Sequence, residues 1–205
     1  MSPVRSARIA VLALAAVLLL AGGGAAAQTA SPGGPRTYYD TIDLSTPDTA
    51  AQSFLAAWGR RDYATVHMTF SPEAQRGWHD QIARNFNVAT LFPAQAKAVW
   101  DGSIYGDAGR ARAGEFASDL NLIFDDLLLA AERAGALPFT LGPGAKVTSQ
   151  SATGDAAKLT VETGGRPATI GLKLVRLPSG RWKIDQIVLP DADPALKPWG
   201  FKAPQ

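Results

Sequence analysis

Cysteine is absent from the 205-residue chain, and histidine and methionine occur only twice each. Without cysteine the chain can form neither a disulfide nor a thiolate metal site, so its hydrophobic core must stabilise the fold unaided. The two histidines lack His-x-x-x-His spacing, and we predict no metal and no other cofactor. Gly-x-Ser-x-Gly and Walker sequences are also missing, which argues against an esterase elbow and a nucleotide phosphate loop.

The N-terminal segment has the features of a secretory signal peptide. Arg5 and Arg8 precede an apolar run over residues 9–20, and small residues follow up to Ala27. We expect cleavage after Ala27, so that the mature protein begins at Gln28. A permanent membrane anchor is the alternative, but a membrane span needs about 20 apolar residues. The run in this chain is shorter.

Charge gives no support for nucleic-acid or anionic-membrane binding. The full chain has a formal net charge of +2, and the two arginines of the leader account for it, so the predicted mature chain is formally neutral. Alanine richness and a preference for arginine over lysine indicate a bacterial protein. We therefore expect a periplasmic or extracellular protein with no membrane span after cleavage.

Composition divides the chain into four parts. Residues 1–27 form the predicted signal peptide, and residues 28–37, rich in Gly, Pro and Ser, predict a flexible linker. Residues 38–190 are enough for one domain. Residues 191–205 are proline-rich and without period, which predicts an irregular tail that packs through its aromatic residues.

Apolar residues at helical spacing open the predicted domain. Thr46 can cap a first helix, and Pro47 suits the first helical position. A second helix is expected from Asp62, and Ser71 begins a third. A longer helix is expected over residues 110–134, with Gly135 after its end, whereas a turn of helix or a short strand is expected near residues 98–104.

From residue 145 the hydrophobic period changes from helical to two. Four runs with this period are separated by the turn sequences Thr-Gly-Asp, Gly-Gly-Arg-Pro and Pro-Ser-Gly, and they cover residues 145–152, 156–163, 168–177 and 181–189. This pattern predicts an antiparallel meander of four strands and an α+β domain.

Both ends of the predicted domain resemble the NTF2-like (cystatin-like cone) superfamily, particularly its small exported bacterial branches. The matching positions in the opening helices are Phe54, Leu55, Trp58, Asp62, Tyr63, Ser71 and Pro72. The closing "SGRWKIDQIVL" is similar to the family's final strand, in which Gly precedes Trp, a basic residue, Ile and Asp. The resemblance implies a cone of N-terminal helices packed on a curved antiparallel sheet, with the long helix as an extra element in the middle.

Strand alternation and the resemblance together suggest residues that could line a cavity in such a cone. Trp182, Ile184 and Val188 share one parity of the last strand, so Asp185 is expected on the other face. The inward wall is expected to be apolar and to face either helices or a cavity. The predicted ligand-binding residues are Trp58, Trp100, Tyr105, Leu172, Leu174, Arg176, Trp182, Ile184 and Gln186.

No residue is predicted to be catalytic. Family enzymes use acid–base side chains that project into the cone, and His67 with Tyr63 is the alternative pair here. We prefer to interpret His67 as a half-exposed helical histidine, because no partner stands at a fixed spacing from it. Asp125 and Asp126 are adjacent on the long helix, and we expect a solvated stripe to account for at least one of them.

The sequence therefore predicts an exported, non-enzymatic NTF2-like domain that binds a small apolar ligand or a protein partner in the bacterial envelope. A homodimer is also possible. The alternative function is an NTF2-like lyase, isomerase or hydrolase acting on a hydrophobic substrate, with His67 or Tyr63 in acid–base roles.

Overall fold

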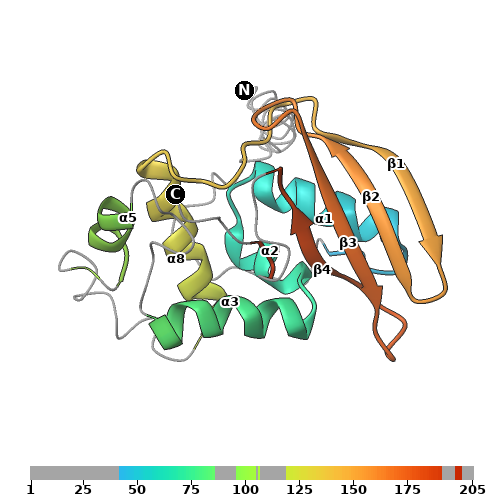
Figure 1. Cartoon of the computed structure of the whole chain (residues 1–205), viewed down its shortest axis with the longest axis horizontal. Coiled ribbons are helices and arrows are strands. Elements are labelled where there is room, and N and C mark those ends of the chain that lie inside the picture. The colour runs from blue at the N-terminus through green and yellow to red at the C-terminus, as the bar shows by residue number, and fades with distance from the viewer. Residues whose placement is uncertain (1–41, 86–95, 105, 107–118, 191–196, 200–205) are drawn as a thin grey trace, which may run out of the picture. The chain divides into compact units, whose positions relative to one another are not determined.

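Helices and an open sheet make up the described part of the chain. The computed structural model describes residues 42–85, 96–104, 106, 119–190 and 197–199. Its helices are α1 (Pro47–Gly59), α2 (Tyr63–Thr69), α3 (Pro72–Asn85), α5 (Ala96–Gly102) and α8 (Leu120–Arg133), and its strands are β1 (Lys146–Thr153), β2 (Ala156–Glu162), β3 (Thr169–Arg176) and β4 (Trp182–Val188). The predicted α+β class is confirmed (Figure 1).

The three N-terminal helices begin where the sequence predicted, the first of them at the predicted cap Thr46. At α1 the Thr46 hydroxyl accepts a hydrogen bond from the Thr49 amide at 3.1 Å, and the Thr49 hydroxyl accepts one from the Thr46 amide at 3.1 Å. The Asp62 carboxylate caps α2, and the Ser71 hydroxyl accepts from the Ala74 amide at 3.0 Å at the start of α3. These side chains satisfy amides that a helix terminus leaves without intrahelical partners.

The sheet is the predicted meander, with strand order β1-β2-β3-β4 and antiparallel neighbours throughout. Alternate residues of β2 and β3 are buried, as a half-buried sheet requires. These buried residues are Ala157, Leu159, Val161, Ile170, Leu172 and Leu174.

A β-bulge in β4 changes the predicted parity of the last strand. Leu174 pairs with Ile184 but Lys173 pairs with Gln186, so Asp185 is the extra residue. Beyond the bulge Ile187 pairs with Leu172 and is buried, while Val188 is 41% exposed. The prediction that Gln186 and Val188 share the face of Ile184 is therefore wrong.

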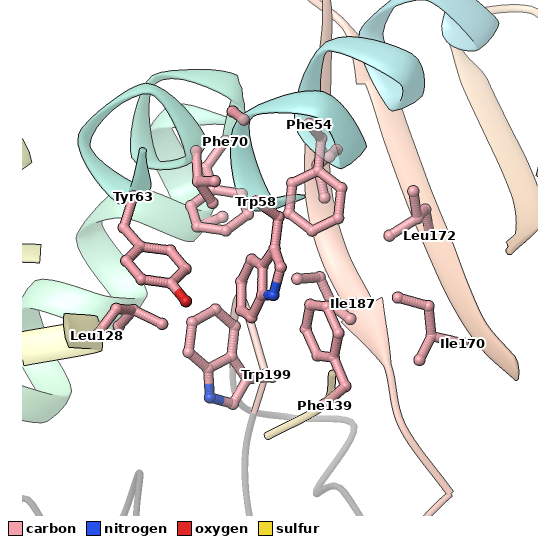
Figure 2. Close-up of a cluster of buried hydrophobic side chains, with 14 of the residues drawn as sticks. Phe54, Trp58, Tyr63, Phe70, Leu128, Phe139, Ile170, Leu172, Ile187 and Trp199 are labelled. Atoms are coloured by element: carbon pink, nitrogen blue, oxygen red, sulfur yellow. The ribbon is translucent and has the colours of Figure 1, made fainter. Parts of the chain in front are cut away.

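The core forms where α1 crosses one face of the sheet, behind the strands in Figure 1. This helix contacts both β1 and β4. Figure 2 shows Trp58 in the middle of an aromatic group. Its ring stacks on Phe139 at 4.0 Å between centroids and meets Tyr63 edge-on at 5.2 Å. Aromatic rings of this size contribute much of the buried apolar area of a small domain.

The long middle helix starts later than predicted. Asp119 has an extended backbone and caps α8, because its carboxylate accepts from the Asn121 amide at 2.9 Å. The helix therefore begins at Leu120, and residues 110–118 of the expected helix lie outside the described residues. Its end is as predicted, since Gly135 follows with a φ of 67°.

Part of the C-terminal tail packs on the domain. Trp199 is fully buried, and the Pro198 carbonyl accepts a hydrogen bond from the Ile187 amide at 2.7 Å. The predicted signal peptide and linker lie outside the described residues. Among the residues that are described, no helix has both the length and the apolar character to cross a membrane.

Candidate functional site

Most of the predicted apolar wall belongs to one packed core. Leu172 and Leu174 are 1% exposed, and Ile184 is fully buried. Trp182 and Trp58 are buried in the same cluster, which also contains side chains of α1, α2 and α8. The inward face of the sheet thus contacts the protein's own side chains.

The other predicted ligand-binding residues do not form a single site with these core residues. Arg176 is exposed near the end of β3, where its Nε donates to the Gly180 carbonyl at 3.4 Å. Gln186 is buried, but its Oε1 accepts from Lys173 Nζ at 2.8 Å. Trp100 packs on the core from α5, and Tyr105 lies outside the described residues.

His67 is buried rather than half-exposed, which corrects our interpretation from the sequence. The residue is 3% exposed, and its Nδ1 lies 2.8 Å from Oδ1 of Asn121 on α8. Because an amide oxygen can only accept, Nδ1 carries the proton, and the neutral ring presents a lone pair at Nε2. Burial lowers the pKa of His67, although the Asn121 bond and the Asp119 charge oppose that shift.

In the described part of the chain, three buried ring nitrogens have no hydrogen-bond partner. They are His67 Nε2, Trp78 Nε1 and Trp199 Nε1. Their rings surround Phe124, with centroid distances to Phe124 of 5.0 Å for His67, 4.9 Å for Trp78 and 6.0 Å for Trp199. Each indole has one donor and the imidazole one lone pair, so burying these three nitrogens costs free energy.

The adjacent aspartates of α8 are both buried, so the expectation of a solvated stripe is wrong. Asp125 Oδ1 accepts from the amides of Tyr63 at 3.0 Å and Ala64 at 3.3 Å. Asp126 Oδ2 accepts from the Ile104 amide at 2.7 Å. Each carboxylate therefore anchors a different segment, the start of α2 or the end of α5.

Tyr63 has little access to solvent, since it is 1% exposed. Burial raises the pKa of its hydroxyl well above the usual range, and the Glu132 and Asp125 charges add to the rise. The phenol is therefore a neutral group at physiological pH. It lies four residues before His67 on α2.

Open hollows on the surface of the described residues include two near the sheet. One has a volume of about 540 Å³ between α1 and the segment before β1, where Gln52, Leu55 and Gly142 line it. The other has a volume of about 470 Å³, and Arg181 and Lys183 line it. Burial lowers the pKa of Lys183 to about 8, and its amine contacts the Met68 carbonyl. The second hollow thus presents two basic side chains beside the start of β4.

Asp185 does not contribute a carboxylate to the apolar wall. It accepts a hydrogen bond from the Ser71 hydroxyl at 2.7 Å and forms an ion pair with Lys197. The bulge residue therefore ties β4 to α3 and to the tail. Within the described residues, no group of three or more acidic or histidine side chains could hold a metal ion.

Sequence reasoning missed the partners of the buried polar groups. Asn121 and Asp119 stand more than fifty positions from His67, and no local spacing connects them.

The chain matches no known family model, and neither curated proteins nor solved structures give a match.

Proposed function

We propose that the protein is an exported, non-enzymatic domain of NTF2-like fold that binds a protein partner in the bacterial envelope. One observation carries the choice of a protein partner over an apolar ligand. Leu172, Leu174 and Ile184, which would line a ligand cavity, are at most 1% exposed and lie in the packed core. Side chains beside a water-sized cavity would keep accessible surface, so these residues leave no room for a ligand beside them.

The order of the elements supports the NTF2-like assignment. Capped helices precede a four-stranded antiparallel meander, and α1 lies across one face of that sheet. The leader-like residues 1–27 and the neutral charge of the remaining chain support export and argue against a nucleic-acid partner.

Native mass spectrometry of protein purified from its own envelope tests the filled core. We expect the mass of the polypeptide without any small apolar molecule. Leu172→Ala should then create a cavity and gain binding of benzene, which the wild type lacks, because buried leucine truncations leave apolar voids. Lys173→Ala, on the exposed face of the same strand, is the matched control. A small apolar molecule retained by the wild type would refute the choice of a protein partner.

Cross-linking in intact cells tests the partner itself. The chain has no cysteine, so single cysteines at exposed positions can carry a photoreactive label without background. Gln52→Cys on α1, Arg76→Cys on α3 and Lys158→Cys on β2 sample three surfaces. We expect one position to give a discrete adduct with one other envelope protein. Absence of any such adduct at all three positions would contradict the proposal.

The enzymatic alternative is favoured by the unpartnered Nε2 of His67. A neutral imidazole with a lowered pKa could accept a proton, and the neutral Tyr63 phenol could donate one. Both side chains are buried, so a substrate would have to displace core residues. Against candidate hydrophobic substrates, His67→Ala should abolish turnover if this alternative holds, and it should leave the partner adduct intact if the proposal holds.

A further inference from the structure

Strand β1 forms an open edge of the sheet. It pairs with β2 on one side, and no described element pairs with its other side. All its residues except Val147 are exposed, although the strand is eight residues long. In Figure 1 it is the outermost strand. A long exposed edge presents unpaired backbone groups to any strand that approaches it.

The register identifies the backbone groups that are free. Thr153 pairs with Ala156 across a two-residue turn, and such a turn is closed by a hydrogen-bonded pair. Hydrogen-bonded and non-bonded pairs alternate along an antiparallel ladder, so Ser151 also bonds β2. The amide and carbonyl groups of Gln150 and Ala152 therefore point away from the sheet.

This edge has few of the features that normally block pairing. Natural edges are protected by charged residues, prolines, bulges or covering loops. From Val147 to Thr153 the sequence has no charge and no proline. A register shift occurs only between Val147 and Ser149, which leaves residues 149–153 regular. The regular part of the edge is thus suited to pair with another strand.

The charges at the two ends of β1 indicate which strand pairs with this edge. Lys146 begins the strand, and Asp155 follows it in the turn, so the ends have opposite charges. We propose that β1 pairs antiparallel with β1 of a second copy, across a two-fold axis at Ser151. Gln150 of each copy then exchanges backbone hydrogen bonds with Ala152 of the other.

The same register makes the end charges complementary. Antiparallel pairing brings the turn of one copy, with Asp155, to the end of β1 that begins with Lys146 in the other copy. Both charged residues are exposed, so the two symmetric attractions are modest. Contact through one strand buries little area, and we expect a reversible dimer whose population rises with concentration. This dimer is independent of the protein partner proposed above.

Disulfide trapping tests the axis directly in a chain without native cysteine. Ser151→Cys would place two thiols in a non-hydrogen-bonded pair with Cα atoms about 4.5 Å apart, which a disulfide can span. Lys158→Cys is the matched control, because Lys158 pairs with Ser151 on the neighbouring strand. In the proposed dimer the Cα atoms of the two substituted positions 158 would lie about 14 Å apart, which is too far for a disulfide. Upon oxidation with diamide, only Ser151→Cys should give a covalent dimer.

Charge reversal at Lys146 and Asp155 gives a second test. The affinity of self-association is measured by sedimentation equilibrium, with protein expressed from the full-length gene. Asp155→Lys and Lys146→Asp each make the facing charges alike, so each variant alone should self-associate about tenfold more weakly than the wild type. An equimolar mixture of the two variants should form a heterodimer with restored affinity. Melting curves of each variant check that the hairpin still folds, since Lys146 also pairs with Glu162 at 3.5 Å.

Three results would overturn the dimer. The wild type could remain monomeric at its highest soluble concentration, or the mixture could associate no more tightly than its components. Ser151→Cys could also cross-link to a different polypeptide and not to itself, which would assign the edge to another protein. A disulfide between two copies of the Ser151→Cys variant, together with restored affinity in the mixture, would establish it.

Discussion

Replacing Asp125 should weaken the fold strongly, because this buried carboxylate caps a helix that is distant in the sequence. Its Oδ1 accepts hydrogen bonds from the Tyr63 and Ala64 amides, which are 62 and 61 positions away. Asp125 is 6% exposed and Ala64 is fully buried, so water has little access to these amides. The contact joins the start of α2 to the middle of α8.

The expected loss follows from the number of donors left without an acceptor. A buried amide that loses its partner costs about 1–3 kcal/mol, so Asp125→Ala should reduce the free energy of unfolding by roughly 2–5 kcal/mol. For a domain of this size the Tm should fall by about 5–15 °C. Asp125→Asn keeps an acceptor oxygen and loses only the charge, so it should cost about 1 kcal/mol.

Urea denaturation followed by tryptophan fluorescence measures these differences. Asp155→Ala is the control, because Asp155 is exposed in a turn and its loss should change stability by about 0.5 kcal/mol or less. Asp125→Ala should be far less stable than Asp125→Asn, and the Asp155 variant should lie close to the wild type. If Asp125→Ala melts with the Asp155 control, the carboxylate does not stabilise α2 and the reasoning is wrong.

Three further predictions concern the core and its buried bases. Leu172→Lys should lower the free energy of unfolding by several kcal/mol because it buries a charge, whereas Lys173→Ala loses only its hydrogen bond to Gln186 and should cost about 1 kcal/mol, and equal melting shifts would contradict the assigned faces. Burial lowers the pKa of His67, so the unfolded chain binds a proton first, and stability should fall as pH drops below about 6.5 more in the wild type than in His67→Gln. Lys183 has a pKa of about 8 against an ordinary value of 10.5, so the unfolded chain keeps the proton longer and stability should rise between these pH values. Lys183→Met should lack that rise in denaturation curves recorded across the range.

Local rules predicted the elements that local chemistry determines. Thr46 caps the first helix as expected, and the next two helices start at Asp62 and Ser71 as expected, since capping depends on residues only a few positions apart. The four strands followed from alternation and turn residues in the same way. Both kinds of signal are contained within short stretches of sequence.

The polar interior could not be predicted by such rules, because its contacts join distant segments. His67 and Asn121 meet only after α2 and α8 pack together. Asp125 and Asp126 are ordinary surface residues by composition, but the segments they bind bury them. Burial of polar groups depends on partners that helical periodicity does not reveal.

The bulge in β4 allows a last prediction. It compares how much the side chain of Asp185 stabilises the sheet with how much the bulge itself does. Asp185 is the extra residue, so its deletion would remove the bulge and leave Gln186 and Ile187 opposite Lys173 and Leu172, on the faces they have now. The core would keep Ile187, so the deletion should cost little more than Asp185→Ala, which loses the same hydrogen bond from Ser71 and the same ion pair with Lys197. Asp185→Asn keeps the Ser71 bond and loses only the charge that pairs with Lys197, so it should cost less than either. Thermal melting of the three variants compares these costs, and a much larger loss in the deletion than in Asp185→Ala would mean that the bulge itself, rather than the side chain of Asp185, stabilises the sheet.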